Sequence, residues 1–129
     1  IPLLMMADVI HGYRTVFPIP LALGASFHPE LVEKAMTMAA AEAASAGLHV
    51  TFSPMTDLVR DPRWGRVLES FGESPWLDAR MAEAYVRGYQ GPDNDLSRPG
   101  RLFAENSISR PRSRRSGRER PASCRLSSP

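Results

Sequence analysis

The chain reads Arg60-Asp61-Pro62-Arg63-Trp64-Gly65-Arg66-Val67-Leu68-Glu69-Ser70 shortly after an apolar run, Leu48-His49-Val50-Thr51-Phe52. The charged stretch combines arginines, carboxylates and a tryptophan, and its proline restricts the backbone. A loop of this kind after a buried strand is where α/β proteins place many of their functional residues. The residues also allow a simpler interpretation, in which the arginines pair locally with Asp61 and Glu69 in a solvated loop.

A long helix is expected before the charged stretch, over residues 29–46. Pro29 suits the first helical position, and Gly47 is a favourable residue for the helix end. Apolar residues recur at helical spacing and predict a buried stripe along this helix. The residues of the stripe are Leu31, Val32, Ala35, Met38, Ala39 and Ala43.

A second helix is expected after the charged stretch, over residues 74–87. Ser74 is a favourable N-cap, Pro75 suits the first position, and Gly88 is expected to end the helix. The residues expected to face inward are Leu77, Met81, Ala84 and Tyr85.

Three short apolar runs predict buried strands, at residues 2–7, 21–25 and 48–53. Asp8 closes the first run. The order strand, strand, helix, strand, helix is typical of βα units. We therefore expect an α/β fold with a parallel sheet or barrel, right-handed crossovers, and functional residues at the carboxyl ends of the strands.

Length and composition restrict the class of protein. A chain of 129 residues can form one modest domain. It begins with Ile1 rather than methionine, which suggests a fragment. No apolar stretch approaches the roughly 18–20 residues that cross a membrane, and a single cysteine, Cys124, excludes an internal disulfide.

The net charge of +2 is unevenly distributed. Residues 98–129 contain nine arginines, only two glutamates and no lysine, whereas the preceding part is acidic. Serine and proline are also abundant in this segment. Such a composition cannot bury enough apolar surface to offset the entropy of ordering, so we expect a disordered basic tail.

Two motifs indicate a family. Asp8, His11 and Gly12 form an Asp-x-x-His-Gly motif, and residues 61–66 read Asp-Pro-Arg-Trp-Gly-Arg. Together with their surroundings they closely resemble the N-terminal barrel domain of glycoside hydrolase family 3, and bacterial β-glucosidases above all. The segments that carry the resemblance are 6–14, 17–18, 23–27, 52–57, 60–70 and 85–91.

The resemblance implies the N-terminal portion of a (β/α)₈ TIM-type barrel over residues 1–102, followed by the tail at 103–129. It also implies hydrolysis of terminal β-D-glucosyl residues with retention of configuration, which requires two carboxyl groups about 5–5.5 Å apart. In the family the nucleophilic aspartate lies on a later barrel strand, and the acid/base glutamate lies further on. This chain reaches neither position, so we expect no catalytic residue in it and no activity of the chain alone.

The resemblance implies a substrate-binding role for Asp8, Arg14 and Arg66, which align with residues around the nonreducing glucose. Glu69 is expected to orient Arg66. The expected partner is therefore a β-glucoside or oligosaccharide, with no cofactor, membrane or specific nucleic acid. A periplasmic and a cytoplasmic location both remain open.

Other residues near the motifs are expected to be structural. Arg63 is expected to pair with Asp57 or Asp61, and Trp64 to pack in the core rather than stack on a sugar. His11 and His49 lack the spacing of metal ligands. No metal site is predicted.

The sequence departs from the family pattern in two places. His28 replaces an aspartate that is the better helix N-cap. After residues 98–102 the family continues into a strand that ends in a Lys-His pair, whereas this chain continues into the Arg/Ser/Pro-rich tail. Two other functions stay open at this point: a noncatalytic sugar-binding remnant, and nonspecific nucleic-acid binding through the tail.

The abrupt change in composition predicts a shift of reading frame near codon 103. A single-base insertion or deletion there should restore a strand that ends in Lys-His. Sequencing the gene tests this directly, and a DNA sequence in which neither alternative frame encodes that strand contradicts it.

Overall fold

The computed structural model of the chain describes residues 3–105. Its elements follow the order β1, α1, α2, β2, η1, α3, β3, where η1 is a short 3₁₀ helix at Val67–Glu69. The expected disordered tail lies outside the described residues from position 106 onward. Within residues 3–105, no helix is long and apolar enough to cross a membrane.

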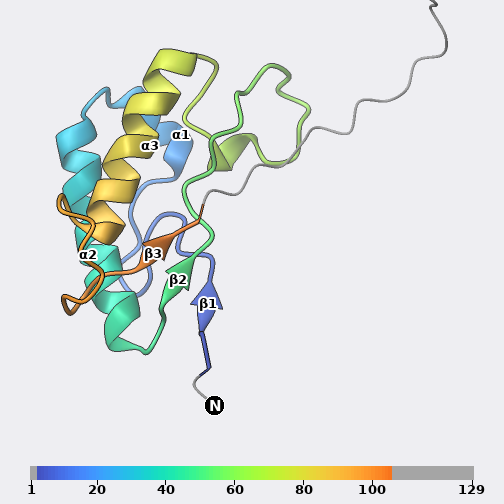
Figure 1. Cartoon of the computed structure of the whole chain (residues 1–129). Coiled ribbons are helices and arrows are strands. Elements are labelled where there is room, and N and C mark those ends of the chain that lie inside the picture. Colours follow the sequence, from blue (N-terminus) through green and yellow to red (C-terminus); the bar gives the residue numbers. More distant parts are fainter. Residues whose placement is uncertain (1–2, 106–129) are drawn as a thin grey trace, which may run out of the picture.

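The sheet has three short parallel strands: β1 at Met6–Ala7, β2 at Val50–Thr51 and β3 at Phe103–Ala104. Their order is β1-β2-β3, so β2 is central. The two long helices lie together on one side of the sheet (Figure 1). The prediction of an α/β fold with a parallel sheet is confirmed.

β3 extends the folded region beyond the expected boundary at residue 102. Val50 pairs in register with Phe103, and Thr51 with Ala104. The Phe103 amide donates to the His49 carbonyl at 2.9 Å, and the Glu105 amide donates to the Thr51 carbonyl at the same distance. The first residues assigned to the tail therefore complete the sheet.

The prediction of a strand at residues 21–25 is wrong, because this segment forms helix α1, Pro20–Ala25. Pro20 occupies the first turn, where its fixed φ favours a helix. Gly24 lies so close to the Phe71 backbone that a Cβ would come within 2.4 Å of the Phe71 carbonyl oxygen. A run of five residues is too short for its periodicity to distinguish a strand from a helix.

The long helices begin where expected. α2 covers Pro29–Ser45 and α3 covers Pro75–Gln90. Ser74 caps α3, since its hydroxyl accepts the Leu77 amide at 3.4 Å. His28 precedes α2 without a side-chain cap, as its identity suggested.

Gly88 does not end α3, which continues to Gln90, so that prediction is wrong. Gly88 instead lies where α3 meets α2. A Cβ on Gly88 would lie 2.6 Å from the Met36 Cβ and 2.8 Å from the Glu33 carbonyl oxygen. The helices approach so closely there that only glycine fits.

The buried stripe of α2 is rotated relative to the prediction. Leu31 and Met38 are 59% and 54% exposed, whereas Met36 and Ala40 are fully buried. The side of α2 that faces α3 and the sheet is therefore rich in alanine, and the larger apolar side chains on either side of it remain in solvent. All four residues predicted to face inward on α3 are buried.

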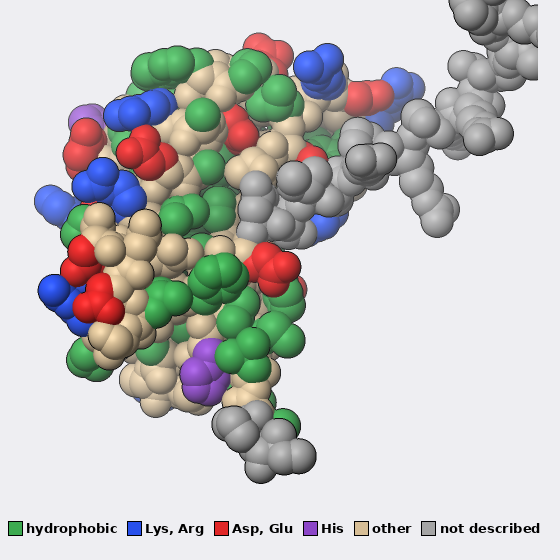
Figure 2. All heavy atoms as spheres, in the orientation of Figure 1, with side chains coloured by type: hydrophobic (Ala, Val, Ile, Leu, Met, Phe, Trp, Pro, Cys, Tyr) green, Lys and Arg blue, Asp and Glu red, His purple; other side chains and the backbone are tan. Residues whose placement is uncertain are grey.

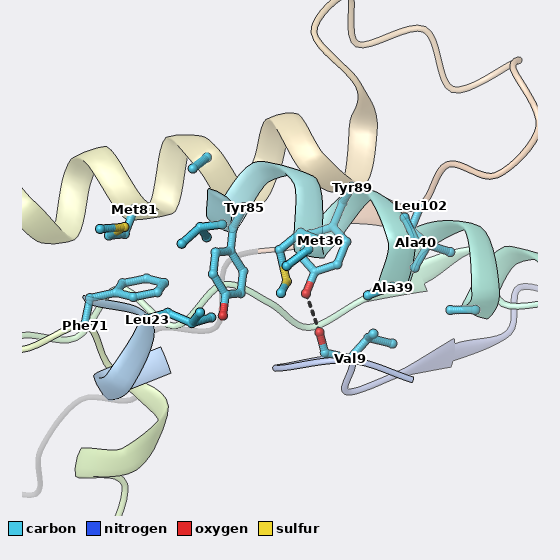
Figure 3. Packing of buried hydrophobic residues seen from close by; sticks show 14 of the residues in the cluster. Val9, Leu23, Met36, Ala39, Ala40, Phe71, Met81, Tyr85, Tyr89 and Leu102 are labelled. Atoms are coloured by element: carbon cyan, nitrogen blue, oxygen red, sulfur yellow. Dashed lines mark hydrogen bonds between the residues drawn. The ribbon is translucent and has the colours of Figure 1, made fainter. Parts of the chain in front are cut away.

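Tyr89 of α3 joins the helical layer to the end of β1. Its hydroxyl donates to the Val9 carbonyl (Figure 3). Tyr85 packs edge-on against Phe71 and Tyr89, with ring centroids 5.0 Å and 5.8 Å apart. Burial raises the pKa of Tyr89, so its hydroxyl stays protonated and remains a donor.

The first apolar run is less buried than expected. Leu3, Leu4, Met5 and Met6 are between 50% and 77% exposed, and only Met6 and Ala7 form the strand. Within residues 3–105, no element covers these side chains. The prediction of a buried strand over this run is therefore wrong for the described part of the chain.

Asp78, in the first turn of α3, is a buried carboxyl group. It is 6% exposed, and its Oδ1 has no hydrogen-bond partner among the described residues. Burial, with a smaller contribution from the nearby Asp57 charge, raises the pKa of Asp78 from 3.8 to about 6. The folded protein therefore binds this proton more tightly than the unfolded chain does.

Replacing Gly88 by alanine should destabilise the fold by about 1–3 kcal/mol, because α2 and α3 must separate to admit the methyl group. Chemical denaturation monitored by circular dichroism measures the change. Gly65→Ala is the matched control, since a Cβ there meets nothing within 4 Å. Equal stability of the two variants contradicts the close packing.

Replacing Asp78 by asparagine should stabilise the protein by about 2 kcal/mol at pH 8 and have little effect near pH 4. The sign follows from the raised pKa: the charged carboxylate is disfavoured by folding, so stability falls as pH rises from about 4 through about 6. Denaturation curves at both pH values test this. Glu73→Gln, which removes an exposed carboxylate just before the helix, is the control and should not stabilise the protein as Asp78→Asn does.

Candidate functional site

The charged loop leaves the carboxyl end of β2 and returns to α3. Its base is closed by the Val59 amide, which donates to the Gly72 carbonyl at 3.0 Å. The buried Ser70 hydroxyl donates to the Asp57 carbonyl. Figure 1 shows the loop beyond the carboxyl ends of β1 and β2, at the edge of the sheet where functional residues were expected.

Arg66 and Glu69 form a two-bond ion pair at the end of this loop. Arg66 Nε donates to Glu69 Oε1 at 3.0 Å, and Nη2 donates to Oε2 at 2.5 Å. Nη1 takes no part in this pair. The pKa of Arg66 is raised first by these bonds and further by the charges of Glu69, Asp57 and Asp8.

Asp8 therefore lies within electrostatic range of Arg66. Asp8 is exposed and directly follows β1, while Asp57 is partly buried and follows β2. Because parallel strands end at one edge of the sheet, residues after β1 and β2 come together there. The structure thus brings together Asp8, Arg66 and Glu69 of the predicted site residues, and adds Asp57.

The backbone after Asp8 is fixed on both sides. The Val9 amide donates to Thr51 Oγ1 at 3.1 Å, and the Val9 carbonyl accepts from the Tyr89 hydroxyl. Thr51 and Tyr89 are fully buried. The sequence analysis missed these two positioning residues, although a threonine within an apolar strand is a signal that a buried hydroxyl has a hydrogen-bond partner.

The backbone of Arg14 is held away from the cluster of Asp8, Arg66 and Glu69. Its amide and the Thr15 amide both donate to Glu42 Oε2 at 2.8 Å, and the Thr15 hydroxyl donates to Oε1 at 2.6 Å. These bonds, with that of the Thr15 hydroxyl the strongest, hold the pKa of Glu42 below its ordinary value. Glu42 belongs to the last turns of α2, which Figure 1 shows far from the charged loop. A sugar contact by Arg14 stays a prediction without geometric support from this arrangement.

Arg63 pairs with Asp61, with Nη2 and Oδ2 2.8 Å apart, so the pairing predicted for Arg63 is confirmed. Trp64 is partly buried rather than part of the core. It borders a hollow of about 300 Å³. The other lining residues are Thr56, Asp57, Leu58, Arg60 and Asp61.

Among residues 3–105, no three His, Cys, Asp or Glu side chains are grouped so as to hold a metal ion. The chemistry available at this edge of the sheet is that of carboxylates and guanidinium groups. Such groups bind hydroxyls through charge-assisted hydrogen bonds.

The chain is similar in sequence and fold to known proteins. Residues 1–104 match the model of the glycosyl hydrolase family 3 N terminal domain. A periplasmic beta-glucosidase of Salmonella typhimurium is 50% identical over 91 residues, which make up 70% of this chain and 12% of that protein. A lysosomal beta glucosidase of Dictyostelium discoideum is 32% identical over 104 residues, and the match covers 77% of this chain and 13% of that protein.

Solved structures of beta-glucosidases are also similar to this chain in fold. A mutant beta-glucosidase from Listeria innocua, determined in complex with laminaribiose, superimposes with a TM-score of 0.80 at 56% identity. The match covers 83% of this chain and 15% of that protein. This chain therefore spans about an eighth of the length of the relatives it matches, and it belongs to glycosyl hydrolase family 3.

Proposed function

We propose that this chain is part of the N-terminal domain of a β-glucosidase, a retaining hydrolase of terminal β-D-glucosyl residues, and that it supplies part of the glucose-binding site. The observation that carries the proposal is the cluster of Arg66, Glu69 and Asp8 at the carboxyl edge of a parallel sheet. Membership of a glycosidase family makes sugar hydroxyls the natural ligands for these groups.

In this proposal Asp8 accepts hydrogen bonds from the outer hydroxyls of the nonreducing glucose. A carboxylate has two oxygens and can accept from more than one hydroxyl, and such charge-assisted bonds are stronger than neutral ones. The bonds that Thr51 and Tyr89 make to Val9 fix the backbone from which Asp8 projects.

Arg66 donates to the same sugar, and Glu69 holds it in place. Glu69 engages Nε and Nη2, so the orientation of the planar guanidinium is set before a ligand arrives. The donors of Nη1 lie outside that pair. Pre-organised donors reduce the entropy lost on binding, which is the contribution we assign to Glu69.

Hydrolysis requires groups beyond this chain. The family resemblance places the nucleophilic aspartate and the acid/base glutamate in later segments, and retention requires both. We infer that the three parallel strands are the beginning of a (β/α)₈ barrel, an architecture of typically about 250 residues. The chain alone is then inactive.

Extending the chain in the restored reading frame should produce hydrolysis of an aryl β-glucoside, and the 129-residue chain should show none. In the extended protein, Asp8→Asn should lower kcat/KM by about 10–100-fold, because it weakens charge-assisted bonds to the sugar. Asp95→Asn, in the exposed loop after α3, is the control and should leave kcat/KM unchanged.

Activity of the 129-residue chain contradicts the proposal that the catalytic pair lies outside it, and Asp57 and Glu69 would then be tested as catalysts. An extended, folded protein that cleaves no β-glycoside contradicts the proposed function itself.

A further inference from the structure

Two exposed aromatic side chains border one hollow at the N-terminal ends of α2 and α3, away from the candidate site. Phe27 is 69% exposed and Trp76 is 71% exposed. The hollow has a volume of about 510 Å³ and is also lined by Pro29, Leu77 and Arg80. Figure 2 shows hydrophobic side chains on the surface over the N-terminal turn of α3.

The backbone at Phe27 has a conformation that is rare for a phenylalanine, with φ at +53°. Hydrogen bonds hold it on both sides. The Phe27 amide donates to the Gly24 carbonyl at 3.1 Å, and the His28 amide donates to the Ser26 hydroxyl at 3.2 Å. A strained residue whose ring remains mostly in solvent gains little packing energy in return, and such residues often serve binding.

A polar groove continues from the aromatic hollow. Pro29 and Arg80 also line a second hollow of about 210 Å³ between the two helices. Four of its charged groups form ion pairs: Arg80 with Glu83 at 3.0 Å, and Arg87 with Glu33 at 3.4 Å. Glu30 adds one further carboxylate to the lining, so the groove disfavours an anionic ligand. The paired groups are held in place and keep donors or acceptors in contact with solvent.

We propose that this surface is a second carbohydrate site, which binds a β-linked gluco-oligosaccharide away from the candidate functional site at the charged loop. The rings of Phe27 and Trp76 cover apolar faces of the sugar, and Arg80 and Glu83 exchange hydrogen bonds with its hydroxyls. A ligand that is neutral, rich in hydroxyls and apolar on its ring faces matches both hollows. The choice of glucose units rests on the proposed function.

Tryptophan fluorescence can separate the two sites, because the chain has two tryptophans, Trp64 at the charged loop and Trp76 at this surface. In a Trp64→Phe variant, emission from Trp76 should change saturably as cellotriose is added. An equal mass of glycerol should not reproduce the change. The titration is made on both the 129-residue chain and the extended protein. In the extended protein, the Trp76 response is the difference between the Trp64→Phe variant and the Trp64→Phe/Trp76→Phe variant.

Phe27→Asn is the informative variant, since asparagine tolerates a positive φ and leaves the backbone in place while the ring is removed. It should weaken cellotriose binding about tenfold. Phe27→Tyr keeps a ring and should bind as the parent does. Val16→Ala removes an exposed apolar side chain elsewhere and is the matched control.

The inference fails if Trp76 shows no saturable response, or if Phe27→Asn binds as tightly as the parent. A response that is present in the short chain but absent from the extended protein also overturns it, since the surface is then an interface with the rest of the polypeptide. Hydrolysis by the extended protein without a Trp76 response contradicts this inference alone. A Trp76 response without hydrolysis contradicts the proposed function alone.

Discussion

The hydrogen bond from the Tyr89 hydroxyl to the Val9 carbonyl connects the helical layer to the edge of the sheet that carries the candidate site. It places the end of β1 at a fixed position relative to α3, and the bond from the Val9 amide to Thr51 fixes the same residue relative to β2. A buried carbonyl without a partner destabilises a fold by about 1–3 kcal/mol. The constraint that satisfies Val9 therefore also sets the position of Asp8, the residue immediately before it.

This contact depends on close packing of the two long helices. Tyr89 follows Gly88, and Gly88 lies against Met36 and the Glu33 carbonyl with no space for a side chain. Alanines at positions 35, 39, 40 and 43 make the facing side of α2 flat. Helices that approach over small residues can support a short sheet that has little hydrogen bonding of its own. The sheet here has only two residues in each strand, so packing against the helices adds to the few hydrogen bonds that join its strands.

Local signals in the sequence predicted the helices well, and nonlocal constraints account for the errors. Proline at the first position and a serine N-cap act within one turn, so the starts of α2 and α3 could be predicted. The role of Gly88 depends on a helix some fifty residues earlier in the chain, and a glycine near a helix end is more often a stop. The exposure of Leu31 and Met38 likewise depends on which side of α2 meets its neighbours.

In the candidate site too, the contacts set by local sequence or strand order could be predicted, and the other contacts could not. Arg66 and Glu69 are three residues apart, so their pairing follows from the motif and the local turn. The proximity of Asp8 to Arg66 follows from the parallel order of β1 and β2, which the βα pattern indicated. Arg14 lies only six residues after Asp8 in sequence, but its loop turns toward Glu42 at the far end of α2. No sequence pattern within that loop indicates that Glu42 is its hydrogen-bond partner.

The locality of these contacts bears on how a family 3 site could assemble. Within the described residues 3–105, several contacts order Asp8, Arg66 and Glu69: the ion pair of Glu69 with Arg66, the closure of the loop at Val59 and Gly72, and the two bonds to Val9. The proposed catalytic pair, in contrast, lies in later segments outside this chain. If the proposed function holds, the groups assigned to sugar binding are therefore ordered by contacts within this chain, whereas the proposed catalytic pair is not. Loop closure over a long chain is the slower and entropically more demanding step, so groups that bind substrate benefit from being placed by contacts already present in the first strands.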